Sequence, residues 1–104
     1  TLDIQASSVP VMDEALAMYE KGMTTGVNPA NREMIEASTH FAPTISEHMQ
    51  EFIVDPQTSG GLLVSVAEPE SINLLDALHE GGVEHAGVIG SVRSLDGTEY
   101  LSFV

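Results

Sequence analysis

The segment Asp55-Pro56-Gln57-Thr58-Ser59-Gly60-Gly61 runs straight into the apolar residues Leu62-Leu63-Val64-Ser65-Val66. Residues 62–67 are nearly all apolar, which is typical of a strand that is buried on both faces. The polar heptapeptide, called the 55–61 loop below, is therefore expected to lie at the start of a core strand. Binding loops are often carried by a rigid element in this way.

The residue types of the 55–61 loop indicate what it can bind. Pro56 fixes one φ and disfavours a helical conformation at Asp55, while the two glycines can take positive φ and admit another group close to the backbone. Successive N–H groups, together with the two hydroxyl side chains, can form a nest for an anion. The residues alone leave a second interpretation open, a tight turn in which Asp55 caps its own loop. A P-loop is excluded, because no Lys follows the glycines.

Downstream of this loop the pattern predicts a strand, a helix, a strand, a turn and a strand. Glu68-Pro69-Glu70 is an acidic helix start, and leucines at helical spacing carry that helix to Gly81-Gly82. Residues 86–92 predict a second strand, Asp96-Gly97 is a hairpin-turn signal, and residues 99–104 alternate as a strand does. This order indicates a layered α/β (α+β) domain with a mixed sheet flanked by helices.

Upstream of the loop, residues 2–9 predict an extended segment that ends at Pro10. Apolar residues at positions 12, 15, 16 and 19 share one face of a helix from Val11 to Lys21, which Gly22 ends. A second helix is predicted from Pro29 to about Thr39, and a short helix from Thr44 to Gln50. The 104 residues are thus expected to form a single domain, 1–104.

Composition excludes several classes of function. Three Lys and Arg against 16 Asp and Glu give a formal net charge of −13, so the chain lacks the basic surface that nucleic acid or an anionic membrane requires. No apolar run approaches the roughly 18 residues of a membrane helix. The absence of cysteine excludes disulfides, thiolate metal sites and a Cys nucleophile. A cytoplasmic location is expected, with no nucleic-acid or membrane partner.

Two further groups of residues have types that occur in binding sites. Gly22 to Asn31 form a second polar, glycine-marked loop that enters a helix, where a phosphate can bind; ordinary capping of that helix by Asn28 is favoured instead. The four histidines offer no i, i+4 pair, since Pro43 separates His40 from His48, so no metal site is expected. No catalytic residue is expected in the chain.

Several segments of the chain resemble the selenophosphate synthetase (selenide, water dikinase) family. The nonapeptide from Asp55 to Leu63 is similar to the family's signature. Residues 9–16 resemble its Val-Pro-x-x-x-x-Ala-Leu helix entry, and Ala86-Gly87-Val88-Ile89-Gly90 resembles its C-terminal Ile-Gly strand. Residues 22–31 resemble Gly-x-x-Pro-Gly-Gly-Thr-x-x-Asn with Gly22, Gly26 and Asn31 aligned. There the chain departs from the family at Thr25, Val27 and Asn28.

The resemblance implies that this is the C-terminal domain of a larger two-domain enzyme, truncated at its N-terminal edge. Such a domain is similar to that of aminoimidazole ribotide synthetase. The family makes selenophosphate, AMP and orthophosphate from selenide, ATP and water. Its ATP and magnesium are held mainly by the N-terminal domains of a homodimer, so no cofactor is expected in the isolated fragment. The partner implied is the missing N-terminal domain, and the fragment alone is expected to be inactive.

The resemblance also implies which residues face the cleft. Thr58, Ser59, Gly60, Gly61 and Asn31 are candidate contacts to phosphate groups, and Asp55 and Gln57 are candidates for positioning the loop. The alternative hypothesis is a stand-alone acidic interaction or regulatory module of the same fold that has no catalytic activity.

Overall fold

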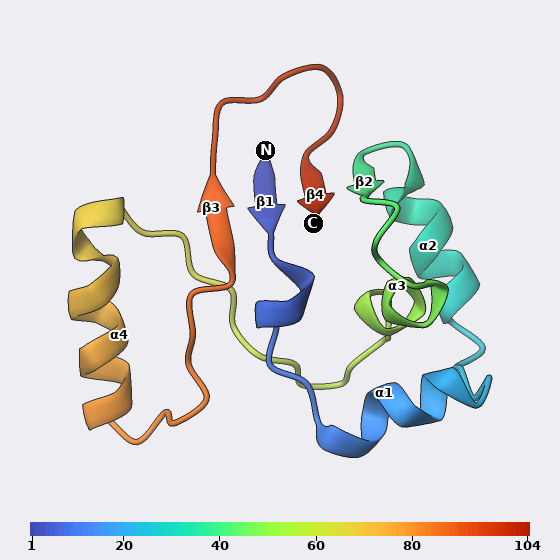
Figure 1. The fold of residues 1–104 in the computed structure, drawn as a ribbon, viewed down its shortest axis with the longest axis horizontal. Coiled ribbons are helices and arrows are strands. Elements are labelled where there is room, and N and C mark those ends of the chain that lie inside the picture. Colours follow the sequence, from blue (N-terminus) through green and yellow to red (C-terminus); the bar gives the residue numbers. More distant parts are fainter.

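The computed structural model describes all residues from 1 to 104 and contains a four-stranded mixed sheet (Figure 1). Its strands lie in the order β2-β4-β1-β3. β1 runs parallel to β4 and antiparallel to β3, and β2 runs parallel to β4. The strands are β1 (Leu2–Ile4), β2 (Thr39–Phe41), β3 (Gly90–Val92) and β4 (Leu101–Phe103). The α/β fold class expected from the sequence is confirmed.

The middle of the sheet is held together by an apolar row that crosses three strands. Phe103 is the register partner of Ile4 on β1 and of Phe41 on β2. The rings of Phe41 and Phe103 stack with centroids 5.0 Å apart and planes inclined by 15°. Ile4 and Phe103 are both buried. Burial of such side chains stabilises the sheet by about 1.5–3 kcal/mol each.

Gly90 is required by the pairing of β1 with β3. A Cβ placed on Gly90 would lie 2.0 Å from the backbone oxygen of Asp3, which is far inside any allowed contact. Only glycine therefore lets β3 approach β1 in this register. This explains physically why an Ile-Gly pair, Ile89-Gly90, stands at the start of β3.

Four α-helices accompany the sheet, and three of them gather near the β2 side of the molecule (Figure 1). α4 stands on the other side, beyond β3. The helices are α1 (Asp13–Glu20), α2 (Asn28–Glu36), α3 (Glu47–Ile53) and α4 (Ser71–Glu80), with short 3₁₀ turns at Ala6–Ser8 and Glu68–Glu70. No helix combines the length and the apolar character needed to cross a bilayer.

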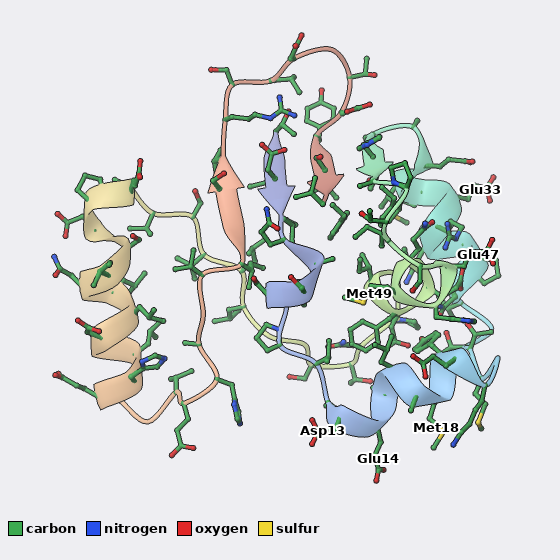
Figure 2. The ribbon with its side chains drawn as sticks, in the orientation of Figure 1. Asp13, Glu14, Met18, Glu33, Glu47 and Met49 are labelled. Carbon is green, nitrogen blue, oxygen red and sulfur yellow. The ribbon has the colours of Figure 1, made fainter.

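The ends of α1 follow local sequence signals. Asp13 and Glu14 occupy its first turn, where carboxylates complement the helix dipole, and both point away from the molecule (Figure 2). At the other end Gly22 has φ of 76°, and its N–H donates to the Tyr19 carbonyl at 2.9 Å. The Met23 N–H donates to the Met18 carbonyl at 3.0 Å, which completes a Schellman motif. The predicted helix and its glycine stop are confirmed.

The expectation that residues 62–67 form a buried strand is wrong in this structure. The segment is assigned to no strand, and Leu62, Leu63 and Val64 are 96%, 61% and 60% exposed. β3, the nearest edge in sequence, pairs only with β1. An apolar run identifies a segment suited to a strand, but burial also requires a partner strand, which the local pattern does not specify.

The C-terminal hairpin is the second correction. Gly97 has φ of 69°, as a tight turn at Asp96-Gly97 requires, but β3 and β4 are not neighbours because β1 lies between them. The connection therefore passes over the end of β1. The strand expected over 86–92 is limited to Gly90–Val92, and the helix expected to reach Thr39 ends at Glu36. Thr39 instead begins β2, a strand that the sequence did not indicate.

Candidate functional site

The 55–61 loop leaves the end of α3 as an exposed connection. Asp55 is half-buried and its N–H donates to the Phe52 carbonyl at 3.1 Å, whereas residues 56–61 are exposed. No backbone N–H from Gln57 to Gly61 donates a hydrogen bond within the chain. These donors are therefore free to bind an external acceptor.

The two loop glycines are not in the left-handed conformation. Positive φ values occur at three other glycines, and Gly60 and Gly61 have none. The nest with alternating right- and left-handed residues is thus not formed in this conformation. A Cβ on Gly60 would lie 2.7 Å from Gln57 Oε1, so the Gln57 side chain lies over the Gly60 backbone. Ligand contact by Thr58, Ser59 and the two glycines stays a prediction.

The root of the loop is bound to α1 through Tyr19. The Tyr19 hydroxyl donates a short hydrogen bond to the Asp55 carboxylate. Tyr19 is only 8% exposed, and its ring packs edge-on against Phe52 with centroids 5.9 Å apart. Burial and then the hydrogen bond to Asp55 raise the pKa of the Tyr19 phenol above its ordinary value, while the hydrogen bond with Asn28 lowers it. The phenol is therefore a neutral donor at physiological pH.

Asn28 is fully buried and joins Tyr19 to α3. Its side-chain amide donates to the Glu51 carbonyl oxygen at 2.8 Å, to Glu51 Oε2 at 3.2 Å and to the Tyr19 hydroxyl at 3.4 Å. Its Oδ1 accepts from the Thr25 hydroxyl at 2.6 Å. Burying a side-chain amide costs free energy unless its donors and its acceptor are hydrogen-bonded, as they are here.

The interpretation of Asn28 as the cap of α2 is therefore wrong. Val27 occupies the cap position, no side chain caps the helix, and Asn28 lies inside its first turn. Asn28 is bonded instead to residues of α1 and α3. The sequence offered no signal for this, because the partners are 9 and 23 residues away along the chain.

Asn31 lies close to the root of the loop. Its Nδ2 donates to the Val54 carbonyl at 2.8 Å, so α2 is bonded to the residue that precedes Asp55. Asn31 and Asp55 also line one groove of about 360 Å³ between α2, α3 and the sheet. Eight of the ten lining residues are apolar, including Ile53, Leu63 and Phe103. The structure thus brings Asn31 and Asp55 together.

Acidic and histidine side chains are spread over the surface. Figure 2 shows Glu33 and Glu47 on the outer side of α2 and α3. His79, in the last turn of α4, has Nε2 2.9 Å from the Ala86 carbonyl oxygen. No group of three or more His, Cys, Asp or Glu side chains is arranged to hold a metal ion.

The fold and the site define a small mixed α/β domain with an exposed polar loop rooted in a buried hydrogen-bonded cluster. Comparison with curated proteins then shows which family the chain resembles. The chain is 38% identical over 86% of its length to a selenide, water dikinase of Pelobacter propionicus. It is 34% identical over 90% of its length to selenide, water dikinase 2 of Peptoclostridium acidaminophilum, and 33% identical over 90% to that of Myxococcus xanthus. Over most of its own length the chain is therefore similar to one part of the selenide, water dikinases.

The alignments cover only part of each relative. The chain spans 26% of the Pelobacter protein, 27% of the Peptoclostridium protein and 26% of the Myxococcus protein, about a quarter of their length. No protein-family profile and no solved structure matches the chain. The family resemblance inferred from the sequence is confirmed, whereas the roles of the individual loop residues are untested.

Proposed function

We propose that this chain acts as one domain of a longer selenide, water dikinase, which makes selenophosphate, AMP and orthophosphate from selenide, ATP and water. The observation that carries the proposal is the alignment of 86–90% of the chain with about a quarter of such enzymes. The remaining three quarters of the enzyme would hold most of the ATP and magnesium. A homodimer in the cytoplasm is the expected form of the whole protein.

Within that enzyme, we expect the 55–61 loop to contact phosphate groups or intermediates. Its free N–H groups and the hydroxyls of Thr58 and Ser59 are donors on an exposed segment. Preorganised donors of this kind stabilise negative charge that develops during phosphoryl transfer. The fixed root at Asp55 supports this role, because a donor stabilises charge only when its position is held.

Alanine substitution of the two hydroxyls in the full-length enzyme tests the proposal. Thr58→Ala and Ser59→Ala should each lower selenide-dependent ATP turnover by about ten- to a hundredfold, since a hydrogen bond to a charged group is worth roughly 1.5–3 kcal/mol. Thr98→Ala and Ser94→Ala are matched controls, because both residues are exposed and their side chains make no hydrogen bond. Unchanged kinetics in both loop variants would show that the loop is only a turn.

The isolated chain provides a second test. It should consume no ATP when selenide is added, because the proposal assigns the reacting groups to the rest of the enzyme. Measurable selenide-dependent ATP consumption by residues 1–104 would contradict this assignment. The reading frame upstream of this chain distinguishes the enzyme from the acidic-module alternative. The enzyme is favoured if that frame encodes a glycine-rich segment with a Lys and with a Cys or selenocysteine.

A further inference from the structure

We propose that Tyr19, Asn28 and Glu51 form a positioning cluster that fixes Asp55 and thereby sets the direction in which the 55–61 loop leaves α3. The effect of this cluster on catalysis rests on the function proposed above. Its effect on the loop itself does not. Tyr19 and Asn28 are positioning residues in this proposal, since neither is required to touch a ligand.

The cluster connects three elements at one point. Tyr19 comes from the last turns of α1, Asn28 from the first turn of α2 and Glu51 from α3. Asn28 bonds both the carbonyl oxygen and the carboxylate of Glu51, and Tyr19 bonds the carboxylate of Asp55. Asp55 is thus held from a helix 36 residues earlier in the chain.

Polar pairing, not only packing, defines the position of Asp55. The T-shaped contact between Tyr19 and Phe52 supplies apolar burial, but such a contact tolerates small rotations. Asn28 has no exposed surface, so each of its hydrogen bonds must be kept if the site is to stay closed. Buried networks of this kind select one arrangement among those that apolar packing alone allows.

A second tether excludes movement of the loop root along α3. Asn31 Nδ2 donates a hydrogen bond to the carbonyl oxygen of Val54, the residue directly before Asp55. Arg32 also pairs with Glu51, at 2.8 Å between Nη2 and Oε1. α2 therefore contacts the end of α3 on both sides of the cluster, and no backbone hydrogen bond anchors residues 56–61.

Amide exchange in the 104-residue chain tests the cluster without any ligand. Tyr19→Phe removes one hydroxyl and keeps the ring. We expect the Asp55 N–H, bonded to the Phe52 carbonyl, to exchange at least about tenfold faster. The Val104 N–H, bonded to Ile4 in the sheet, should keep its rate. Tyr100→Phe is the matched control, because Tyr100 is 59% exposed and its hydroxyl makes no hydrogen bond.

The pattern of exchange decides the outcome. Faster exchange at Asp55 alone supports a positioning role, whereas equal acceleration at Asp55 and Val104 shows a general loss of stability and overturns the proposal. An unchanged Asp55 rate overturns it too. Asn28→Ala provides a second variant. A larger acceleration at residues 51–55 than at Val104 supports the cluster, and equal acceleration at both places counts against a local role.

Kinetics of the full-length enzyme separate this inference from the proposed function. Tyr19→Phe should lower kcat/KM for ATP about tenfold, because a displaced loop loses contacts made in the transition state. If Thr58→Ala and Tyr19→Phe both leave kcat/KM unchanged while Asp55 exchange accelerates, the proposed function fails and the cluster stands. If Thr58→Ala is impaired and Tyr19→Phe is not, the cluster does not position the loop for catalysis, and the inference fails alone.

Discussion

The Tyr19 hydroxyl donates a hydrogen bond to the Asp55 carboxylate, and so joins α1 to the first residue of the 55–61 loop. Tyr19 is nearly buried, Asp55 is half-buried, and the two residues are 36 positions apart in the chain. A charged acceptor makes such a hydrogen bond stronger than one between neutral groups. The pair therefore holds the first residue of the exposed loop in place, and it helps to raise the pKa of the Tyr19 phenol.

Alkaline titration should detect this pair directly. The chain has two tyrosines and no tryptophan, so Tyr100→Phe leaves Tyr19 as the one phenol whose ionisation changes the near-ultraviolet absorbance. We expect its midpoint above the ordinary value of about 10, because burial and Asp55 both disfavour the phenolate. Asp55→Asn should move the midpoint down, and Asn28→Ala should move it up. An ordinary midpoint in the Tyr100→Phe protein would contradict the buried pair.

The same shift sets how stability depends on pH. The folded-state pKa of Tyr19 lies above its unfolded value, so the neutral phenol stabilises the fold fully below about pH 10. That contribution is lost as the pH rises through the folded-state pKa. Urea unfolding at a series of alkaline pH values should show a decline in the free energy of unfolding that Tyr19→Phe reduces and Tyr100→Phe does not.

Asn28→Ala should destabilise the chain by about 1–3 kcal/mol. The substitution leaves the part-buried Glu51 carbonyl oxygen and Thr25 hydroxyl without their partner, and each unpaired group costs desolvation energy. Asn73→Ala is the matched control on exposed α4, where the amide makes one long contact of 3.4 Å with Glu70. Chemical denaturation of both variants gives the comparison, and equal midpoints would contradict the role of Asn28.

Local signals in the sequence were sufficient to predict that four helices are present, although α3 begins at Glu47 and not at Thr44, and α2 ends at Glu36 and not at Thr39. The start of α1 at two carboxylates, its stop at Gly22 and the start of α4 after Glu68-Pro69-Glu70 are each decided within a few residues. Ser46 also caps α3, accepting from the Met49 N–H at 3.2 Å. Capping and periodicity depend on neighbours along the chain, so a sequence contains this information.

Features that depend on distant partners could not be predicted. β2 pairs with β4, whose partner residues lie about sixty positions further on (Thr39 with Leu101), and three residues are too few for a periodic pattern. Asn28 has a residue type that suits a helix cap, and its burial is decided by α1 and α3. Of the candidate site, the sequence identified the 55–61 loop and Asn31 but missed Tyr19 and Asn28, which hold the loop root.

Gly90→Ala should destabilise the chain by more than about 2 kcal/mol. The new Cβ would collide with the Asp3 backbone, which cannot move without breaking the pairing of β1 with β3. Gly87→Ala, three residues earlier, meets nothing within 4 Å and should change stability by less than about 0.5 kcal/mol. Thermal unfolding of the Gly90→Ala and Gly87→Ala variants measures the difference. Similar melting temperatures would disprove the close approach of β3 to β1 at Gly90.

Self-association is expected through the exposed apolar segment 62–66. Leu62, Leu63 and Val64 are more than half exposed, their segment belongs to no strand, and β2 and β3 leave free edges on the sheet. Such segments add to strand edges of other molecules. Sedimentation should show mass that increases with concentration and that Leu62→Lys reduces. A strictly monomeric wild-type chain at high concentration would argue against this prediction.

Comparing the free energies of unfolding of Leu62→Ala and Ile4→Val tests whether residues 62–67 are exposed or lie in the core. Leu62 is 96% exposed, so Leu62→Ala should change the free energy of unfolding by less than about 0.5 kcal/mol. Ile4 is 8% exposed at the centre of the sheet, and Ile4→Val should cost about 1 kcal/mol although it removes fewer atoms. The order of the two values is the test, because a buried strand at 62–67 would reverse it. A cost of about 2 kcal/mol or more for Leu62→Ala would place this segment in the core, as its apolar pattern alone predicted.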